Sequence, residues 1–119
     1  TGHGVGYFLN VHEGPHAISK KNNINFQEGM IVSNEPGYYE KDKFGIRIEN
    51  LIFVKKKKNK IYFENLTMAP IEKDLILRES LNKNEKKWIN NYHKIVFKNL
   101  IKYMNKIEAL ELQKACSPI

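Results

Sequence analysis

The sequence has little of several residue types that mark particular classes of protein. Its one cysteine, Cys116, excludes an internal disulfide framework and fits a reducing compartment. No apolar run approaches the roughly 20 residues that cross a bilayer as a helix. Arginine is represented only by Arg47 and Arg78, although it is the side chain best suited to bidentate phosphate recognition. These absences argue against a disulfide scaffold, a membrane-spanning helix and a dedicated nucleic-acid-binding protein.

The net charge of +7 is placed unevenly along the chain. Residues 1–54 hold five Lys/Arg and six Asp/Glu, a balance of −1, whereas residues 55–119 hold fifteen and seven, a balance of +8. The basic half opens with Lys55–Lys58 and Lys60, close to Tyr62 and Phe63. Such a patch could bind nucleic acid, but lysines also blunt the edge of a sheet at a solvated hairpin tip. We favour the hairpin tip because arginine is so scarce.

Apolar runs and turn residues predict a set of strands in the first part of the chain. Residues 4–11 predict a turn that leads into a short strand, and residues 16–27 predict a polar loop. A buried strand is expected at 30–34, ended by the turn pair Pro36-Gly37, with a charged loop at 40–43. A second strand is expected at 45–56, with 61–63 as its hairpin partner across Lys58-Asn59. Residues 66–77 predict an irregular connection through Pro70.

The strongest periodic signal lies at residues 82–104 and predicts an amphipathic helix. One face carries a stripe of apolar residues: Trp88, Tyr92, Ile95, Val96, Leu100, Tyr103 and Ile107. Asn82 and Glu85 predict a capping box at its start, and a second short helix is expected at about 106–115. We interpret the stripe as core packing, and His93 beside it as a surface or boundary residue. Strands followed by helices indicate an α/β or α+β fold.

Two carboxylates stand out among the strand residues. In a strand, Arg47 and Glu49 share one face because side chains alternate, and a plain buried ion pair is the commoner explanation of such a pair. Glu35 follows an apolar strand and precedes a tight turn, a position from which it could project into a cleft. If the two strands are antiparallel neighbours, Glu35 and Glu49 converge, and a divalent cation would relieve their repulsion.

Two histidines lie in the Gly-rich opening segment TGHGVGYFLNVHEGP. His3 and His12 could supply nitrogen ligands or acid–base groups, although a single histidine in a Gly-rich turn more often serves as a hydrogen-bonding residue. His16 is assigned no role. The segment lacks the Lys-Ser/Thr ending of a phosphate-binding loop, and no nucleophile motif such as G-x-S-x-G is present.

Taken in order, these motifs resemble the Xaa-Pro aminopeptidase (aminopeptidase P) family. The similarity covers TGHGVGYFLNVHEGP, EPGYY, GIRIEN, FENLTMAPI and the WINNYH helix, which is nearly the whole chain, and is greatest to the eukaryotic cytosolic form. It implies the C-terminal part of a pita-bread catalytic domain, a curved mixed or antiparallel sheet with a long C-terminal amphipathic helix. Within residues 1–119, segment 1–81 would hold the strands and metal-site loops, and 82–119 the helical segment.

The resemblance also implies roles for particular residues. His3, Glu35 and Glu49 match metal ligands, with Glu35 also moving a proton and Glu49 bridging two ions. His12 matches a histidine that contacts substrate and assists catalysis, and Arg47 would orient Glu49 or the proline end of the substrate. The implied cofactors are two divalent ions, usually Mn²⁺, which suits an oxygen-rich ligand set. The implied substrate is a peptide with proline at its second position, cleaved in the cytoplasm, without nucleic acid or membrane as partner and with a homodimer as one alternative for the full-length protein.

One departure from the family pattern affects what this chain is expected to do. Two aspartate ligands belong upstream of Thr1, and neither Asp42 nor Asp74 matches their positions. We therefore expect a C-terminal piece of a larger enzyme that is inactive alone. Two alternatives stay open, namely a prolidase-type dipeptidase of the same fold and a non-catalytic interaction protein of that fold, with nucleic-acid binding a distant third.

Overall fold

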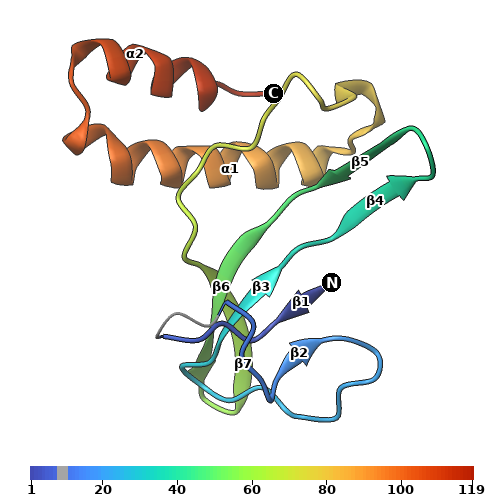
Figure 1. Ribbon diagram of the computed structural model, residues 1–119. Helices are drawn as coiled ribbons and strands as arrows, with labels where there is room; N and C mark the ends of the chain where they lie inside the picture. The colour runs from blue at the N-terminus through green and yellow to red at the C-terminus, as the bar shows by residue number, and fades with distance from the viewer. Residues whose placement is uncertain (8–10) are drawn as a thin grey trace. The chain divides into compact units, whose positions relative to one another are not determined.

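The computed structural model describes residues 1–7 and 11–119 and consists of two compact units, Thr1–Thr67 and Met68–Ile119. The strands belong to the first unit and the helices to the second (Figure 1). This segregation confirms the expected α+β class. The segments 1–81 and 82–119 remain a prediction about the organisation of a longer domain.

In the described part of unit 1, short strands pair in antiparallel ladders. β1 (Gly2–His3) pairs with β2 (Ala17–Ile18), and β4 (Gly37–Glu40) pairs with β5 (Phe44–Arg47). The third ladder has the order β3-β6-β7, with β3 at Ile31–Asn34, β6 at Asn50–Lys57 and β7 at Lys60–Asn65. The predicted strand at 30–34 and the predicted hairpin across Lys58-Asn59 are thereby confirmed, and the cluster of lysines lies at the hairpin tip.

The core of unit 1 is formed where β3 lies against β6. Side chains of β6 alternate, so Asn50, Ile52 and Val54 are buried while those between them are more exposed. Val32 of β3 is the register partner of Ile52 and has no exposed surface. The pairing of Val32 with Ile52 fixes the register of the two strands, because a slip of one residue would turn the buried side chains of a strand toward solvent.

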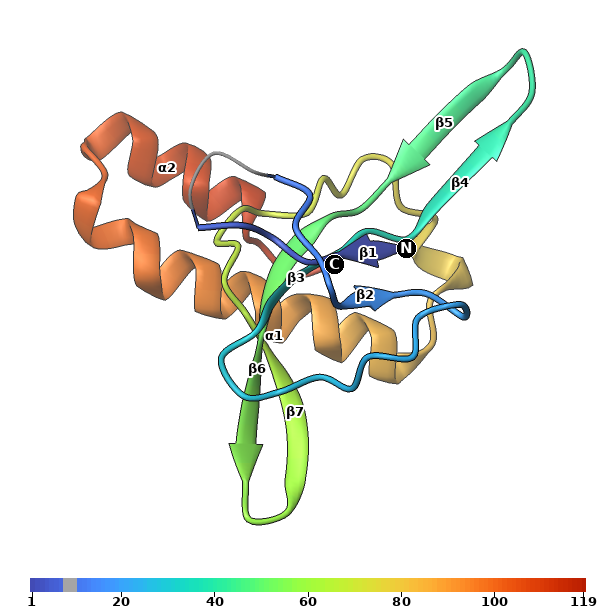
Figure 2. The same cartoon turned by 60° about the horizontal axis from the view of Figure 1, so that its bottom comes forward.

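The strand predicted at 45–56 is interrupted in the structure. It forms β5 and β6, with Ile48 and Glu49 between them, and the turn pair predicted at Pro36-Gly37 is instead the junction from β3 into β4. Pro36 has no N–H to donate to the ladder, although its carbonyl accepts from the Ile48 N–H at 3.3 Å. The chain therefore folds as one long hairpin with a break in each arm, as Figure 2 shows by following β3 into β4 and β5 back into β6.

Two predictions concern the first 27 residues: one falls partly outside the described residues, and the other needs correction. The described strand lies at Gly2–His3, and Gly4 makes only an isolated bridge to Val32; the rest of the strand predicted within 4–11 falls partly on residues 8–10, outside the described residues. The loop predicted at 16–27 contains β2, because Ala17 and Ile18 pair with β1.

Unit 2 contains two helices, each begun by a capping box. α1 runs from Lys83 to Leu100 and continues as the 3₁₀ turn η2 (Ile101–Tyr103), and α2 runs from Lys106 to Ala115. Before them lie the irregular connection through Pro70 and the 3₁₀ turn η1 (Arg78–Ser80). The Asn82 side chain accepts from the N–H groups of Asn84 and Glu85, while Glu85 accepts from the Asn82 N–H. The predicted capping box, the connection and the second helix are confirmed.

The buried face of α1 is rotated from the predicted stripe. Its buried residues are Ile89, Tyr92, His93 and Val96, whereas four residues of the stripe are at least half exposed: Trp88, Ile95, Tyr103 and Ile107. The prediction of a surface position for His93 was wrong, because its side chain has no exposed surface. Tyr92 and Val96 pack with Leu112 of α2 to form the core of unit 2. Packing against α2 therefore decides which side of the apolar stripe is buried.

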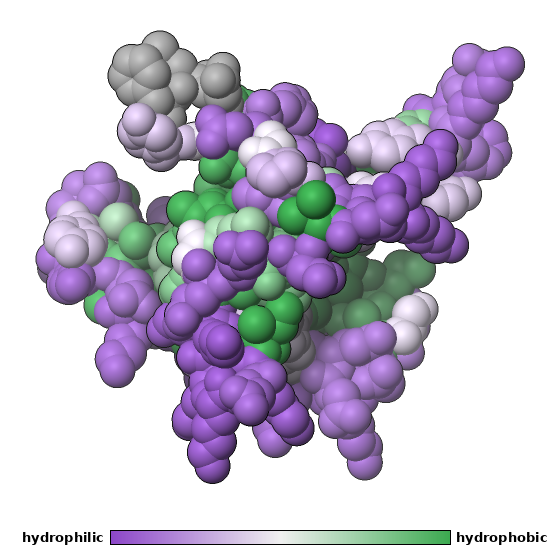
Figure 3. All heavy atoms as spheres, turned by 90° about the horizontal axis from the view of Figure 1, so that it is seen from below, coloured by the Kyte–Doolittle hydropathy of each residue, from purple (hydrophilic) through white to green (hydrophobic). Residues whose placement is uncertain are grey.

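Hydrophobic side chains also remain open to solvent in both units. In the β4–β5 hairpin, Tyr38, Tyr39 and Phe44 are each more than half exposed, and in unit 2 the same holds for Leu75, Leu77 and Trp88. Figure 3 shows hydrophobic residues in green between hydrophilic residues in purple on the face it draws. Isolated exposed apolar residues are common on protein surfaces, but this set is large for a chain of 119 residues.

Candidate metal centre

The break in the long hairpin brings the two candidate carboxylates together. The ladder pairs Asn34 with Asn50 below the break and Gly37 with Arg47 above it. The register is the same on both sides, so Glu35 lies opposite Glu49. Like charges directly opposite each other destabilise a sheet unless a counter-charge is present. The antiparallel pairing on which the expected convergence depends is therefore present, although Glu49 lies between two strands rather than within one.

Glycines allow the segment that carries His3 to approach these carboxylates. A Cβ atom added to Gly2 would lie 2.0 Å from the carbonyl oxygen of Ser33, so only glycine fits at this distance. The close approach lets the His3 N–H donate to Ser33 Oγ at 3.0 Å, and the Glu35 N–H donates to the Thr1 carbonyl at 2.8 Å. The Gly-His sequence thus places an imidazole beside Glu35.

The His3 ring presents one nitrogen to Glu35. Its Nδ1 lies 2.8 Å from the Gly4 carbonyl, which assigns the Nδ1 proton to that hydrogen bond and leaves Nε2 facing Glu35 Oε1 at 3.2 Å. In a neutral ring, the Nε2 lone pair would face an anionic oxygen, an arrangement that a proton or a metal cation relieves. His12 lies against the same ring, with 4.0 Å between ring centroids, and is itself exposed.

Arg47 connects the two carboxylates. One guanidinium nitrogen lies 3.1 Å from Glu35 Oε2, and Nε lies 3.5 Å from Glu49 Oε2. A plain buried Arg47–Glu49 ion pair is therefore not what the structure contains. Arg47 also contacts Glu35, and the side chains of Arg47 and Glu49 are about half exposed. One guanidinium shared by two acidic groups offsets the repulsion between them.

Glu35 is the most enclosed of the charged groups at this site, with 15% of its side chain exposed. The Ser33 hydroxyl donates to Oε1 at 2.7 Å, and this hydrogen bond is the main reason that the pKa of Glu35 lies below its usual value. Burial acts in the opposite direction, whereas the charges of Arg47 and of the His3 ring lower the pKa further. Glu35 is therefore an anion over the physiological pH range.

The donor set fits a divalent cation as part of a larger ligand shell. An imidazole nitrogen and two carboxylates are ligands that Mn²⁺ and similar ions accept, and His3 Nε2 and Glu35 Oε1 already converge. Among residues 1–7 and 11–119, no three or more His, Cys, Asp or Glu side chains form a cluster that could hold an ion as it stands. Further ligands would be needed to complete the shell, and Glu49 would have to move away from Arg47 to take part in it.

Ser33 is the residue of this site that sequence reasoning missed. A signal was present, because Ser33 and Glu35 are two residues apart at the end of a strand and so share a face. His16, assigned no role, places its Nε2 2.8 Å from the Ile31 carbonyl and so supports β3 from the opening segment.

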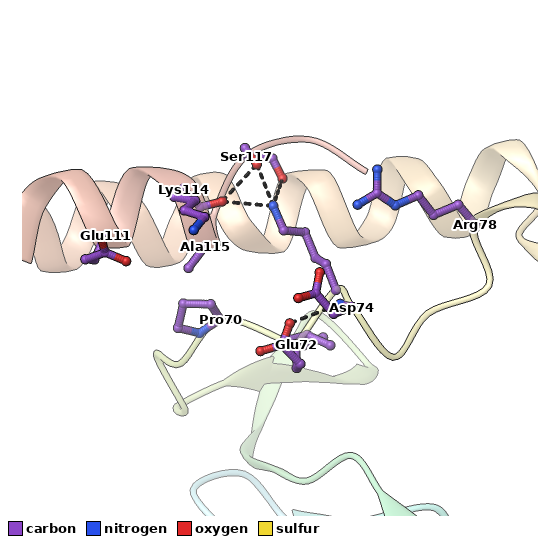
Figure 4. A pocket seen from close by; sticks show the side chains of 10 residues that line it. Pro70, Glu72, Asp74, Arg78, Glu111, Lys114, Ala115 and Ser117 are labelled. Carbon is purple, nitrogen blue, oxygen red and sulfur yellow. Dashed lines mark hydrogen bonds between the residues drawn. The ribbon is translucent and has the colours of Figure 1, made fainter.

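A separate pocket lies within unit 2, with a volume of about 410 Å³ (Figure 4). Lys73 reaches across it, and its ammonium group donates to the Lys114 and Ser117 carbonyls, at 2.9 Å each. A cation at the last carbonyls of α2 is a favourable end for a helix. Both acidic and basic side chains line the pocket, so it shows no preference for a ligand of one charge: Glu72, Asp74, Arg78, Glu111 and Lys114.

Comparison with known families accounts for both halves of the chain. Residues 1–56 match the model of metallopeptidase family M24, and residues 60–119 match the model of the C-terminal region of peptidase M24. The chain belongs to metallopeptidase family M24. All the candidate site residues lie in the segment matched by the first M24 model, and both helices lie in the segment matched by the second. In the part of the chain that the structure describes, none of the helices combines the length and the apolar composition of a membrane-spanning segment.

Relatives of this M24 chain carry a consistent name. A Laccaria bicolor protein named "Probable Xaa-Pro aminopeptidase P" is 48% identical over 132 residues, covering 100% of this chain and 21% of the relative. "Xaa-Pro aminopeptidase 1" of Dictyostelium discoideum is 46% identical over 115 residues, covering 87% and 18%. "Aminopeptidase P1" of Arabidopsis thaliana is 41% identical over 130 residues, covering 100% and 20%. The chain thus spans about one fifth of the length of these relatives.

A solved structure confirms the M24 fold. The crystal structure of X-prolyl aminopeptidase from Caenorhabditis elegans, described as a cytosolic enzyme with a di-nuclear active site, matches with a TM-score of 0.86 and 38% identity. The match covers 100% of this chain and 21% of that one. The expected resemblance to Xaa-Pro aminopeptidases and the expected fold are both confirmed.

Proposed function

We propose that this chain is part of a Xaa-Pro aminopeptidase, which releases the N-terminal residue from peptides whose second residue is proline. The observation that carries the proposal is that His3 Nε2 faces Glu35 Oε1 at 3.2 Å, with Glu49 opposite Glu35 in the ladder, in an M24 chain. The names of the relatives and the di-nuclear site described for the C. elegans enzyme support it.

In this proposal, His3, Glu35 and Glu49 contribute ligands to two divalent ions, which we expect to be Mn²⁺. When bound, the ions would activate water and polarise the scissile carbonyl. His3 presents Nε2 because its Nδ1 proton is held by Gly4. Glu35 keeps its carboxylate ionised under the influence of Ser33 and can take up a proton from the attacking water.

His12 and Arg47 would act on the substrate side of the site. The exposed ring of His12 lies against His3, where it can donate a hydrogen bond to the peptide as charge develops on the carbonyl oxygen. Arg47 is half exposed and already contacts both carboxylates. We propose that it orients Glu49 or contacts the proline end of the peptide.

The three ligand residues of this chain would need partners from elsewhere in the longer protein. We propose two aspartates upstream of Thr1, since neither Asp42, in the β4–β5 turn, nor Asp74 matches a ligand position of the family pattern. We further propose a cytoplasmic location and a peptide substrate, with a homodimer as one alternative for the full-length protein.

Replacing Glu49 tests this assignment in the full-length protein. Glu49→Ala is expected to lower kcat/KM for a Xaa-Pro-Xaa tripeptide more than about 100-fold, because losing a ligand costs more than the 10–100-fold typical of residues that support ligands. Glu64→Ala is the matched control, since Glu64 is an exposed β7 carboxylate that pairs with Lys55. A near-wild-type rate for Glu49→Ala would refute the assignment. Adding a Xaa-Pro dipeptide as second substrate separates this enzyme from a prolidase.

The 119-residue chain alone is expected to show no Xaa-Pro hydrolysis, because three protein ligands do not complete a shell for two ions. The measurement is tripeptide turnover by the isolated chain with added Mn²⁺, beside the full-length protein as positive control. Robust turnover by the chain alone would show that its own residues suffice.

A further inference from the structure

The Ser33 hydroxyl lies between the His-bearing segment and Glu35. Ser33 belongs to β3 and has no exposed surface, so its hydroxyl must find partners within the protein or carry a desolvation cost. It accepts from the His3 backbone N–H at 3.0 Å and donates to Glu35 Oε1 at 2.7 Å. One buried side chain therefore contacts two of the residues proposed as ligands.

The hydroxyl has a single proton, and the distances show where it goes. The other acceptor within reach is the His3 carbonyl at 3.5 Å, which is long for an O–H···O hydrogen bond, whereas 2.7 Å to the carboxylate is optimal. The proton is therefore directed to Glu35. The hydroxyl lone pair receives the His3 N–H, so the donor and acceptor roles of Ser33 are both used.

This contact determines which oxygen of Glu35 faces which neighbour. Oε1 receives the Ser33 proton and faces His3 Nε2, whereas Oε2 faces Arg47. Arg47 alone is a weaker constraint, because its side chain is about half exposed and because its positive charge would be repelled by a bound cation. A neutral hydroxyl can keep its hydrogen bond to Oε1 when a cation is present.

We propose that Ser33 is a positioning residue for metal binding, which holds the Glu35 carboxylate and the His3 backbone in one fixed arrangement. The proposal rests on the proposed function, because it concerns the same pair of ligands. Partners that orient ligands commonly change metal affinity 10–100-fold when removed. Ser33 acts through Glu35 and His3, so the property that depends on it most directly is metal affinity.

The experiment titrates the metal-stripped full-length protein with Mn²⁺ alone, by calorimetry, at fixed pH. Ser33→Thr and Ser33→Val form a matched pair of nearly equal volume that differ in the hydroxyl. Ser33→Val and Ser33→Ala are expected to bind Mn²⁺ at least about 10-fold more weakly than wild type, and Ser33→Thr to restore most of the affinity. Val54→Ala, a truncation at a residue of the same sheet with 1% exposure, is the stability control and should keep wild-type affinity.

Two results would overturn the role of Ser33 while leaving the proposed function intact. They are a folded Ser33→Val variant that binds Mn²⁺ as tightly as Ser33→Thr, and a Val54→Ala variant that loses as much affinity as Ser33→Ala. If Ser33→Ala fails to fold, the Thr/Val pair still decides, because both occupy the same volume. A wild-type protein that binds no Mn²⁺ and cleaves no Xaa-Pro peptide would instead overturn the proposed function and this inference together.

Discussion

His93 is held neutral by its surroundings in unit 2. Its side chain is fully buried, and its Nε2 accepts the Ile71 N–H at 3.0 Å, which assigns the ring proton to Nδ1. Nδ1 is buried and has no hydrogen-bond partner among the described residues. Burial and the nearby charge of Lys73 lower the pKa of His93 from its usual value of 6.5. The ring therefore anchors the segment after Pro70 only while it stays uncharged.

This residue predicts a loss of stability in mild acid. Below pH 6.5 the unfolded chain protonates His93 while the folded chain resists, so the free energy of unfolding should fall as pH falls from 6.5 toward the lower folded-state pKa. In His93→Gln, the side-chain carbonyl can still accept from Ile71 but does not titrate. The wild-type curve should therefore be steeper than that of the variant, in urea unfolding measured between pH 5 and 8. Parallel curves would contradict the prediction.

At the site, the sequence identified the residues that carry unusual chemistry. His3, Glu35 and Glu49 stand out because charged or imidazole side chains follow glycines or apolar strands, and strand pairing places Glu35 opposite Glu49. Ser33 was missed because serine in a strand has no chemical signature until its neighbour is known. Which oxygen of Glu35 faces which partner depends on the close approach at Gly2, a contact between distant segments that no local pattern reveals.

At the scale of the elements, each helix depends on an asparagine at its start. In α1, Asn82 accepts from two N–H groups at 2.9 and 3.0 Å that would otherwise have no helical partner. Asn82→Ala is expected to lower the free energy of unfolding by about 1 kcal/mol. Asn91→Ala, an exposed position within the same helix, is the control and should be neutral or slightly stabilising. Urea unfolding measures both, and equal effects of the two substitutions would contradict the role of the cap.

Local signals explain which elements the sequence predicted well. The capping box at Asn82 and the bounds of α2 depend on residues three or four apart, so they are visible in the sequence. The division of 45–56 into β5 and β6 depends on Pro36, a residue across the ladder. The buried side of α1 likewise depends on Leu112 in another helix. The periodicity of the sequence shows that an apolar stripe exists, but not which of its residues α2 will cover.

At the scale of the whole chain, exposed apolar residues outnumber the buried ones. Only seven hydrophobic residues form the core of the described chain, against twenty large hydrophobic residues that are exposed. Surfaces of this kind associate with other apolar surfaces. The isolated 119-residue chain is therefore expected to bind the dye ANS and to self-associate at micromolar concentration, in contrast to the full-length protein. Dye fluorescence and light scattering are the measurements, and a monodisperse chain without dye binding would contradict the expectation.

The register between the two arms of the long hairpin is the same on both sides of the break, and this limits where residues can be inserted or deleted. Glu35 and Glu49 face each other because the arms between them, β4 and β5, match in length. The turn at residues 41–43 takes no part in the pairing of β4 with β5. Residues can therefore be added there while the two carboxylates stay opposite each other. One residue added within β5 alone would bring a neighbour of Glu49 opposite Glu35 unless a bulge absorbed it. Insertions and deletions should therefore be tolerated at the tip, or as equal changes in both arms, and should be harmful elsewhere between the two glutamates.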